Sequence, residues 1–339
     1  MSRYSEEIRV GVIGAGGMGA RHATNLSARV TGARVAGVTD LDRERAGKLA
    51  AECGGAAYES EGDLIRSEDI DAVVIASPDA THAGLALECL EHEKPVLCEK
   101  PLATSAEDAR RVVDAEVALG QRLVQVGFMR RYDPQHVAVA EAVAAGAIGS
   151  PVLFKGVHRN LAAHPGATSE SILFNSAVHD LDSARWFLDA EIEEVSVRGA
   201  DTAGAGALDL QVIQLSLENG RLADIEVYVN AGYGYEVDAE VVGDRGTVRL
   251  APADAPVLRR GRRAGHEVEG DWLQRFPRAY EIEARRWVGS LHAGELTGPD
   301  AWDGYMALVA VEACVAAVRS GSAERLKSAS VPELYGEAR

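Results

Sequence analysis

Glycines at fixed spacing follow the first apolar run of the chain. Residues 14–19 read GAGGMG, which matches the pattern GxGxxG, and a strand-like run over 8–13 comes directly before them. In such a loop the first glycine allows a tight turn, the second lets the backbone approach a pyrophosphate, and the third lets the following helix pack close to the strand. The phosphates then meet free N–H groups and the positive end of the helix dipole. We therefore predict a dinucleotide site with Gly14, Gly16, Gly17 and Met18 against the cofactor.

An acidic residue follows at the position where a nucleotide site uses one. Asp40 ends the next strand-like run, 33–40, and lies 21 residues after Gly19. A carboxylate there accepts hydrogen bonds from the adenosine ribose hydroxyls and repels a 2′-phosphate, which favours NAD over NADP. Arg43 lies nearby and weakens this preference slightly. The alternative is a plain glycine turn in which Asp40 caps the next helix.

A lysine stands at the carboxyl end of another predicted strand. Lys100 lies between Glu99 and Pro101, directly after the run 95–98. Removing a hydride from a secondary alcohol also requires removing the hydroxyl proton. A partly desolvated lysine near the positive charge of NAD⁺ has a pKa lowered toward neutrality, which suits a general base. A surface lysine is the alternative that these three residues alone leave open.

The loop after the most apolar strand is a second candidate for the cofactor site. The segment SPDATH over 77–82 comes directly after the continuous apolar run 71–76. Ligands of open parallel sheets bind beyond the carboxyl ends of the strands, so Ser77, Pro78 and His82 are predicted to face the cofactor. The alternative is a turn in which Pro78 only starts the following helix.

The elements that position these residues alternate between strand and helix patterns. Strand-like runs lie at 8–13, 33–40, 71–76, 95–98 and 123–126, and helical patterns lie at 20–29, 43–53, 82–92 and 105–119. Strands that alternate with helices of about 10–15 residues imply βαβ crossovers and a parallel sheet. The fold class is therefore α/β, beginning with an N-terminal Rossmann domain built on a doubly wound parallel sheet.

From about residue 130 the strands follow one another. They are predicted at 151–158, 193–198, 208–217, 221–230, 235–242 and 247–250, with late helices at 277–292 and 299–320. Asn219-Gly220 tolerates the positive φ of a type I′ turn, and residues 243–246 are a candidate for another hairpin. Consecutive hairpins predict a C-terminal α+β domain with a large, mostly antiparallel open sheet. We interpret the arginine-rich segment as an exposed turn, with a phosphate grip as the alternative; its arginines are Arg259, Arg260, Arg262 and Arg263.

Charge and composition exclude several classes of partner. The chain has 35 Lys and Arg against 52 Asp and Glu, a net charge of −17, which repels nucleic acids and anionic membranes. No run approaches the roughly 20 apolar residues that span a bilayer, and the N-terminus does not resemble a secretory signal. The four cysteines show no zinc or CxxC spacing, and no metal is implied. We expect a reduced, cytoplasmic protein.

The motifs together resemble a known family. The glycine loop, Ser77-Pro78 with His82, and Glu99-Lys100-Pro101, in this order and spacing, are similar to the glucose–fructose oxidoreductase, inositol dehydrogenase and rhizopine catabolism (Gfo/Idh/MocA) family. The resemblance covers essentially the whole chain, since that family also has a second domain with an open, mostly antiparallel sheet. It implies that Lys100 is the catalytic acid/base and that the protein is a homo-oligomer, namely a tetramer.

Three further stretches resemble the inositol 2-dehydrogenase branch of this family. They read GFMRRYD at 127–133, HRN at 158–160 and SAVHDLD at 176–182. The resemblance implies that His179 shares a proton relay with Lys100, and that His158, Asn160 and Tyr235 line a polyol pocket. A polyol needs hydrogen-bonding groups that point inward, because each unpaired buried hydroxyl is costly. The alternatives are a capping or core role for His179 and an exposed hairpin position for Tyr235.

Two positions in these stretches carry further expectations. Inositol dehydrogenases have an aspartate four residues before the histidine, whereas this chain has Asn175. An amide can orient His179 or hold a substrate hydroxyl, but it cannot stabilise an imidazolium by charge. We interpret Asn175 as a substrate ligand, with Lys100 and His179 transferring the proton without a carboxylate. Arg130 is either a cofactor-side residue or a surface or structural ion-pair residue.

The sequence thus predicts NAD-dependent oxidation of a secondary hydroxyl of a cyclitol, myo-inositol or a related inositol, to the ketone. Residues 1–127 are predicted to form the NAD-binding Rossmann domain, and 128–339 the domain for substrate binding and oligomerisation. Glu99, Lys100 and Arg130 join the predicted cofactor-binding residues. The alternatives are a dehydrogenase of an aldopyranose sugar or an aminocyclitol, and a non-catalytic NAD-binding regulator of the same fold.

Overall fold

The computed structural model describes residues 7–251, 258–260, 262–265, 267–327 and 329–336. They form two compact units, and neither unit is continuous in sequence. The first unit runs to Tyr132 and also includes Arg278–Val309 and the residues from Ala329, whereas the second comprises Asp133–Pro277 and Ala310–Ser328. The chain first leaves the first unit shortly after the predicted boundary at 127. It later returns to that unit with segments that a single boundary assigns to the C-terminal domain.

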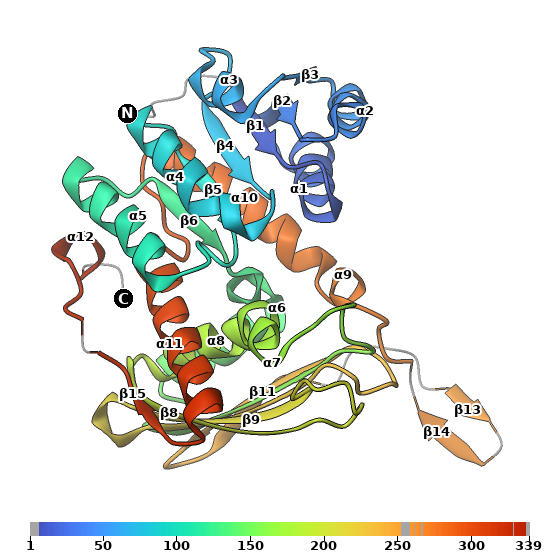
Figure 1. The fold of residues 1–339 in the computed structure, drawn as a ribbon, viewed down its shortest axis with the longest axis vertical. Helices are drawn as coiled ribbons and strands as arrows, with labels where there is room; N and C mark the ends of the chain where they lie inside the picture. Colours follow the sequence, from blue (N-terminus) through green and yellow to red (C-terminus); the bar gives the residue numbers. More distant parts are fainter. Residues whose placement is uncertain (1–6, 252–257, 261, 266, 328, 337–339) are drawn as a thin grey trace. The chain divides into compact units, whose positions relative to one another are not determined.

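The first unit is a doubly wound sheet of six parallel strands in the order β3-β2-β1-β4-β5-β6 (Figure 1). Every residue of β4 and β5 is buried, as expected where helices cover both faces of a parallel sheet. The elements are β1 (Ile8–Ile13), α1 (Gly17–Ala28), β2 (Ala33–Thr39), α2 (Arg43–Cys53), β3 (Ala56–Ala57), α3 (Glu61–Arg66), β4 (Ala72–Ile75), η1 (Asp79–Thr81), α4 (His82–Glu91), β5 (Val96–Glu99), α5 (Ala106–Leu119), β6 (Val124–Gly127), η2 (Met129–Tyr132) and α12 (Glu333–Gly336). The predicted Rossmann sheet is confirmed.

A helix from late in the sequence completes the core of this sheet. Helix α10 (Pro277–Ala293) carries Trp287 and Leu291 into the same apolar cluster as Ile8 of β1. Near the end of the helix, the ring Nε2 of His292 lies 2.9 Å from the carbonyl oxygen of Gly32. The apolar face of α10 therefore belongs to the nucleotide-binding fold, although more than 140 residues separate it from β6.

The second unit is built on a mixed sheet of seven strands in the order β12-β11-β7-β10-β9-β8-β15. All neighbours are antiparallel except β7 and β10, which pair in parallel. The elements are α6 (Pro134–Ala144), β7 (Pro151–Arg159), α7 (Ser169–Ile172), η3 (Leu173–Ala177), α8 (Val178–Leu188), β8 (Ile192–Ala200), β9 (Leu210–Leu217), η4 (Glu218–Gly220), β10 (Leu222–Tyr228), β11 (Glu236–Gly243), β12 (Thr247–Arg249), β13 (Leu258–Arg260), β14 (Arg263–Gly265), α9 (Trp272–Arg275) and β15 (Glu324–Arg325). The mostly antiparallel sheet is confirmed, but the expectation that the strands pair as successive hairpins is wrong where β7 lies between β10 and β11.

One face of this sheet is covered and the other is open. Helix α8 packs against β7, and α6 packs against β11 and β12. Along β9, Ile213 and Leu215 are buried, whereas Gln214 between them is exposed and Val212 before them is 36% exposed. This period-two alternation is typical of a sheet with one solvated face. Leu222 of β10, 50% exposed, also belongs to the open face.

The two predicted hairpins are present in the second unit. Asn219 and Gly220 have φ of +63° and +74° between the antiparallel strands β9 and β10. Between β11 and β12, the N–H of Gly243 donates to the carbonyl of Gly246 at 2.8 Å. The arginine-rich segment differs from the predicted turn: the backbone of β13 and β14 forms an antiparallel ladder, with Gly261 outside the described residues.

Three helical features differ from the sequence-based expectation. Helix α1 begins at Gly17, three residues early, because glycines with low helix propensity adopt helical angles here. Helix α3 was not predicted; Ser60 caps it by accepting the N–H of Asp63 at 3.1 Å. Helix α11 (Ala301–Ser320) is long and apolar enough to cross a membrane by length and composition alone, contrary to the expectation, but 61% of its most apolar window is buried in the protein. A long apolar helix in the core of a folded domain meets the same criteria of length and composition.

Candidate active site

The glycine loop leaves open space where a pyrophosphate is predicted. Gly14 has φ +94°, and a Cβ there would lie 2.5 Å from the carbonyl oxygen of Ala76. A Cβ on Gly19 would lie 1.7 Å from the carbonyl oxygen of Gly14. In contrast, a Cβ on Gly16 or Gly17 meets no atom within 4 Å. Two glycines therefore allow close packing of strand and helix, while the other two border free space at the start of α1, beside the partly exposed Met18.

Asp40 lies at the end of β2 and is held as a carboxylate. It accepts the N–H of Ala15 at 2.6 Å, the N–H of Asp42 at 2.8 Å and the guanidinium of Arg45 at 2.6 Å. Burial raises the pKa of Asp40, but these hydrogen bonds outweigh it and keep the pKa below its ordinary value. Asp42 caps α2 by accepting the N–H of Arg45, so the alternative of Asp40 as the cap is wrong. Sequence reasoning named Arg43, but the paired arginine is Arg45.

His82 joins the two loops predicted to border the cofactor. Its buried ring lies between two carbonyl oxygens, with Nδ1 2.7 Å from that of Pro101 and Nε2 2.9 Å from that of Ser77. The hydroxyl of Ser77 lies 2.6 Å from that of Thr81. Pro78 is exposed and precedes the 3₁₀ turn η1. The loop thus both follows β4 and starts a helix, and His82 fixes it to the segment after Lys100.

Lys100 follows β5 and is partly buried, as the base hypothesis requires. Burial lowers the pKa of Lys100; the carboxylates of Glu99 and Asp79 oppose this shift, and the charge of Arg130 adds to it. Arg130 lies in η2 and is only 2% exposed, so a surface position for this arginine is wrong. The bond between Lys100 and Pro101 is cis.

Three predicted substrate-side residues come together in the second unit. His158 of β7, His179 in the first turn of α8 and Tyr235 before β11 are all buried. The ring centroids of His158 and His179 are 6.5 Å apart, and those of His158 and Tyr235 are 5.6 Å apart. The Tyr235 hydroxyl lies 3.4 Å from Nε2 of His158. The alternative of an exposed hairpin tyrosine is therefore wrong.

A carboxylate that sequence reasoning missed completes this group. Asp180 is fully buried on α8, and its Oδ2 lies 3.1 Å from Nδ1 of His158. The carboxylate accepts the Nδ1 proton and stabilises a positive charge on the ring. Asp180 stands beside His179 in the sequence, but its partner is 22 residues earlier. Only the packing of α8 on β7 reveals the pair.

The two predicted asparagines differ in their surroundings. Asn160 follows β7 and is tied down by its backbone: its N–H donates to Tyr228 at 2.9 Å and its carbonyl accepts the N–H of Ala231 at 3.0 Å. Its buried side-chain oxygen has no hydrogen-bond partner among the described residues. Asn175 lies in the π-helical turn η3 and is exposed. Such turns are often found at functional sites.

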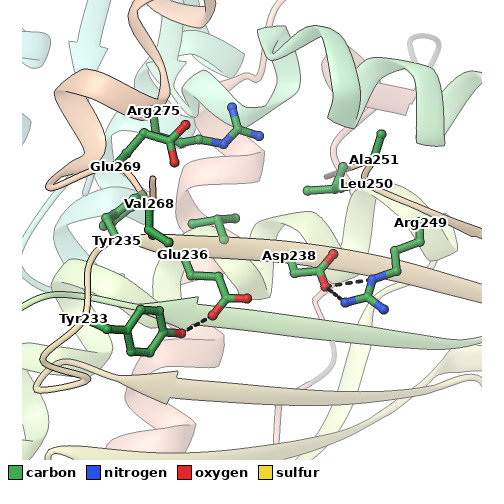
Figure 2. A pocket seen from close by; sticks show the side chains of 11 residues that line it. Tyr233, Tyr235, Glu236, Asp238, Arg249, Leu250, Ala251, Val268, Glu269 and Arg275 are labelled. Carbon is green, nitrogen blue, oxygen red and sulfur yellow. Dashed lines mark hydrogen bonds and ion pairs between the residues drawn. The ribbon is translucent and has the colours of Figure 1, made fainter. Parts of the chain in front are cut away.

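A cavity of about 420 Å³ lies beside β11 in the same unit (Figure 2). Its lining includes Tyr235 but neither of the two histidines. Figure 2 shows Asp238 facing Arg249, whose Nε lies 2.8 Å from the carboxylate, and Tyr233 directed at Glu236. Asp238 and Arg249 thus pair with each other, whereas Glu236 and Arg275 pair with Arg159 and Asp133 outside the lining. Of the residues predicted to bind the polyol, Tyr235 lines this cavity and His158, Asn160, Asn175 and His179 do not.

Comparison with known proteins identifies the family. The profile described as "Oxidoreductase family, NAD-binding Rossmann fold" matches residues 8–128, and "Oxidoreductase family, C-terminal alpha/beta domain" matches residues 140–326. The chain belongs to the Gfo/Idh/MocA oxidoreductase family. Among members, inositol 2-dehydrogenase of Rubrobacter xylanophilus is 58% identical over 335 residues, which cover 98% of this chain and 96% of that protein.

Solved structures of inositol dehydrogenases are similar to this chain over nearly its whole length. The myo-inositol dehydrogenase of Lactobacillus casei, in complex with NAD(H) and myo-inositol, matches with a TM-score of 0.93 and 33% identity, covering 97% of this chain and 99% of that one. The scyllo-inositol dehydrogenase of the same organism, with NAD(H) and scyllo-inositol, matches at 0.88 with 25% identity, covering 95% and 100%. The family and these relatives together show that this chain is an NAD-dependent oxidoreductase that acts on CH–OH groups.

The residues of this Gfo/Idh/MocA member fit NAD. The open space over Gly16 and Gly17 accepts a pyrophosphate at the start of α1, and the Asp40 carboxylate suits a ribose diol. Among the described residues, no three His, Cys, Asp or Glu side chains are grouped so as to hold a metal ion.

Proposed function

We propose that this chain oxidises a secondary hydroxyl of a cyclitol, myo-inositol or a related inositol, to the ketone. The observation that carries the proposal is the full-length similarity to an enzyme solved with NAD(H) and myo-inositol, at a TM-score of 0.93. The relative that is 58% identical in sequence is an inositol 2-dehydrogenase by name. A buried group of polar rings, His158, His179 and Tyr235, supplies the hydrogen-bonding side chains that a polyol needs.

Lys100 is the acid/base of this proposal. NAD, when bound, accepts the hydride. The hydroxyl proton passes to the Lys100 amine, which is available because burial lowers its pKa. The carboxylates of Glu99 and Asp79 oppose the lowering of the Lys100 pKa, so the ammonium form stays accessible for the reverse reaction.

His179 assists the transfer, and the neighbouring residues hold the ring of hydroxyls. Asp180 stabilises a proton on His158, so a carboxylate is present on the substrate side although Asn175 replaces the aspartate of related enzymes. Asn160 offers its buried side-chain oxygen to a hydroxyl donor. Asn175 acts as a substrate ligand. Replacing it as Asn175→Asp is expected to change the pH profile or the preferred cyclitol, and no change in either contradicts this role.

An initial-rate screen tests the proposed activity. We expect NADH formation with NAD⁺ and at least one of myo-, scyllo- or chiro-inositol, well above the rates with NADP⁺, an aminocyclitol, glucose or xylose. Lys100→Met is expected to lose at least about a thousandfold in kcat, in the upper part of the range for a general base. Lys48→Met on the exposed face of α2 is the matched control. A preference for glucose or xylose makes the chain a sugar dehydrogenase, and no turnover with any substrate favours a non-catalytic regulator.

We also propose that the open sheet face joins copies of this chain in a homotetramer. The face carries Val212 and Leu222 at 36% and 50% exposure, with Leu153 beside Leu222. Apolar side chains on a solvated sheet face are typical of an interface. Light scattering on a sizing column is expected to give four chains, and Leu222→Lys is expected to lower that number. A monomeric wild type contradicts the proposal.

A further inference from the structure

Beside Lys100 lies a buried group of ionisable side chains, two of which, His22 and Glu283, have no role in the proposed proton transfer. His22 comes from α1, one turn after the glycine loop, Glu99 ends β5, and Glu283 comes from α10. All three belong to the first unit and are buried, His22 and Glu283 completely. Burying ionisable groups is costly unless they are paired. The group therefore calls for an explanation.

The contacts connect the cofactor helix to the lysine strand. Nε2 of His22 lies 2.7 Å from Oε1 of Glu99, a geometry in which the ring N–H donates to the carboxylate. The other oxygen of Glu99 accepts the backbone N–H of Lys100 at 3.3 Å. Glu99 is thus fixed at both oxygens, by the helix that begins at the glycine loop and by Lys100 itself.

Glu283 faces the same group from α10. The ring of Tyr280, one turn earlier on that helix, meets the ring of His22 edge-on at 6.1 Å, which puts Glu283 on the same helix face. Among the described residues, neither oxygen of Glu283 nor Nδ1 of His22 has a hydrogen-bond partner. Burial and the nearby Glu99 charge raise the pKa of Glu283 far above its ordinary value. This shift favours the uncharged form of Glu283.

That charge acts on Lys100. Three charged groups of its own unit act on the lysine: Glu99 and Asp79 favour its ammonium form, and Arg130 disfavours it together with burial. Of the two carboxylates, Glu99 is the one with a buried histidine bonded to it. The basicity of the lysine amine therefore depends on whether Glu99 stays charged and in place.

We propose that His22 is a positioning residue for the acid/base lysine: it holds the Glu99 side chain beside Lys100. The inference rests on the proposed role of Lys100. Through His22, the helix that meets the cofactor phosphates is coupled to the residue that takes the substrate proton.

The pH profile of kcat/KM for polyol oxidation tests this role. Lys100 must lose its proton to act as a base, so the rate rises with pH up to the pKa of Lys100. Withdrawing the Glu99 charge lowers that pKa, and the rising limb moves to lower pH. We expect a shift of about one pH unit for Glu99→Gln and a shift in the same direction for His22→Leu. His22→Gln keeps an N–H near the position of Nε2 and is expected to restore the wild-type profile. Glu283→Gln is also expected to match wild type, because it stays uncharged.

The controls separate this inference from the proposed function. His292→Leu removes another histidine of the same unit, one that contacts Gly32 instead of Glu99, and is expected to leave the profile in place. A wild-type enzyme that oxidises no polyol overturns the proposed function. An active wild type with an inactive Lys100→Met variant, but with superimposable profiles for wild type, His22→Leu and Glu99→Gln, overturns the positioning role alone. If His22→Leu does not fold, Glu99→Gln and His22→Gln decide the question.

Discussion

Replacing the glycines of the nucleotide loop one at a time separates cofactor binding from folding. A Cβ on Gly16 meets no atom within 4 Å, and its φ of −70° is open to any residue. A Cβ on Gly19 would lie 1.7 Å from the carbonyl oxygen of Gly14, far inside any normal contact. We therefore expect Gly16→Ala to fold like wild type and to bind NAD poorly, whereas Gly19→Ala is expected to fold poorly.

The magnitudes follow from the space around each glycine. Gly19→Ala forces the backbone of the loop away from α1, and such overpacking costs about 3 kcal/mol in the free energy of unfolding. Gly16→Ala changes that free energy by about 0.5 kcal/mol or less, as surface substitutions do. Its methyl group occupies the approach of the pyrophosphate, so the KM for NAD⁺ is expected to rise about tenfold or more, equivalent to about 1.4 kcal/mol.

Two measurements on each variant check this reasoning. Denaturant unfolding gives the change in stability, and initial rates at saturating polyol give the KM for NAD⁺. A Gly16→Ala enzyme with the wild-type KM would refute the placement of the pyrophosphate over this residue. A Gly19→Ala protein as stable as wild type would refute the close packing of α1 against the loop.

Three further predictions concern charged residues. Burial raises the pKa of Glu116 to about 7 from an ordinary 4.5. The stability due to its protonated form is present below pH 4.5 and is lost as the pH rises through 7, a loss of about 3 kcal/mol in the free energy of unfolding. Unfolding measured at pH 4.5 and at pH 8 is expected to show this loss in wild type and not in Glu116→Gln. Asp40→Ala leaves Arg45 without its partner, and the ratio of kcat/KM for NAD⁺ to that for NADP⁺ is expected to fall about a hundredfold in steady-state assays. Asp180→Asn removes the charge that holds His158, so kcat/KM for the polyol is expected to fall at least about tenfold while the KM for NAD⁺ stays unchanged.

The parts of the fold that local pattern determines could be predicted from the sequence. The apolar run at β4 indicates a strand, and the glycines at 14–19 indicate a tight turn between β1 and α1, each within a few residues. The turn at Asn219-Gly220 is equally local, since it depends on two residues that tolerate positive φ. The parallel pairing of β7 with β10 is not local, because no turn connects them, and the pattern of either strand is the same with a parallel or an antiparallel neighbour.

The site shows the same division. The Lys100 motif and the histidine at 179 stand out in the sequence by type and by neighbours. Asp180 and His22 do not, because each acts through a partner on another element: His158 on β7 and Glu99 on β5. A buried acid–imidazole pair has no signature in one sequence, since either residue alone is as consistent with a helix surface or a cap.

The late arrival of α10 has a consequence for how the protein is made. Trp287 and Leu291 belong to the apolar cluster around β1, yet they leave the ribosome more than 150 residues after β6. At typical rates of translation this interval lasts on the order of ten seconds or more. During it the nascent nucleotide-binding sheet lacks the helix that later covers this cluster. Apolar surface exposed in this way is prone to aggregation, and chaperones shield it.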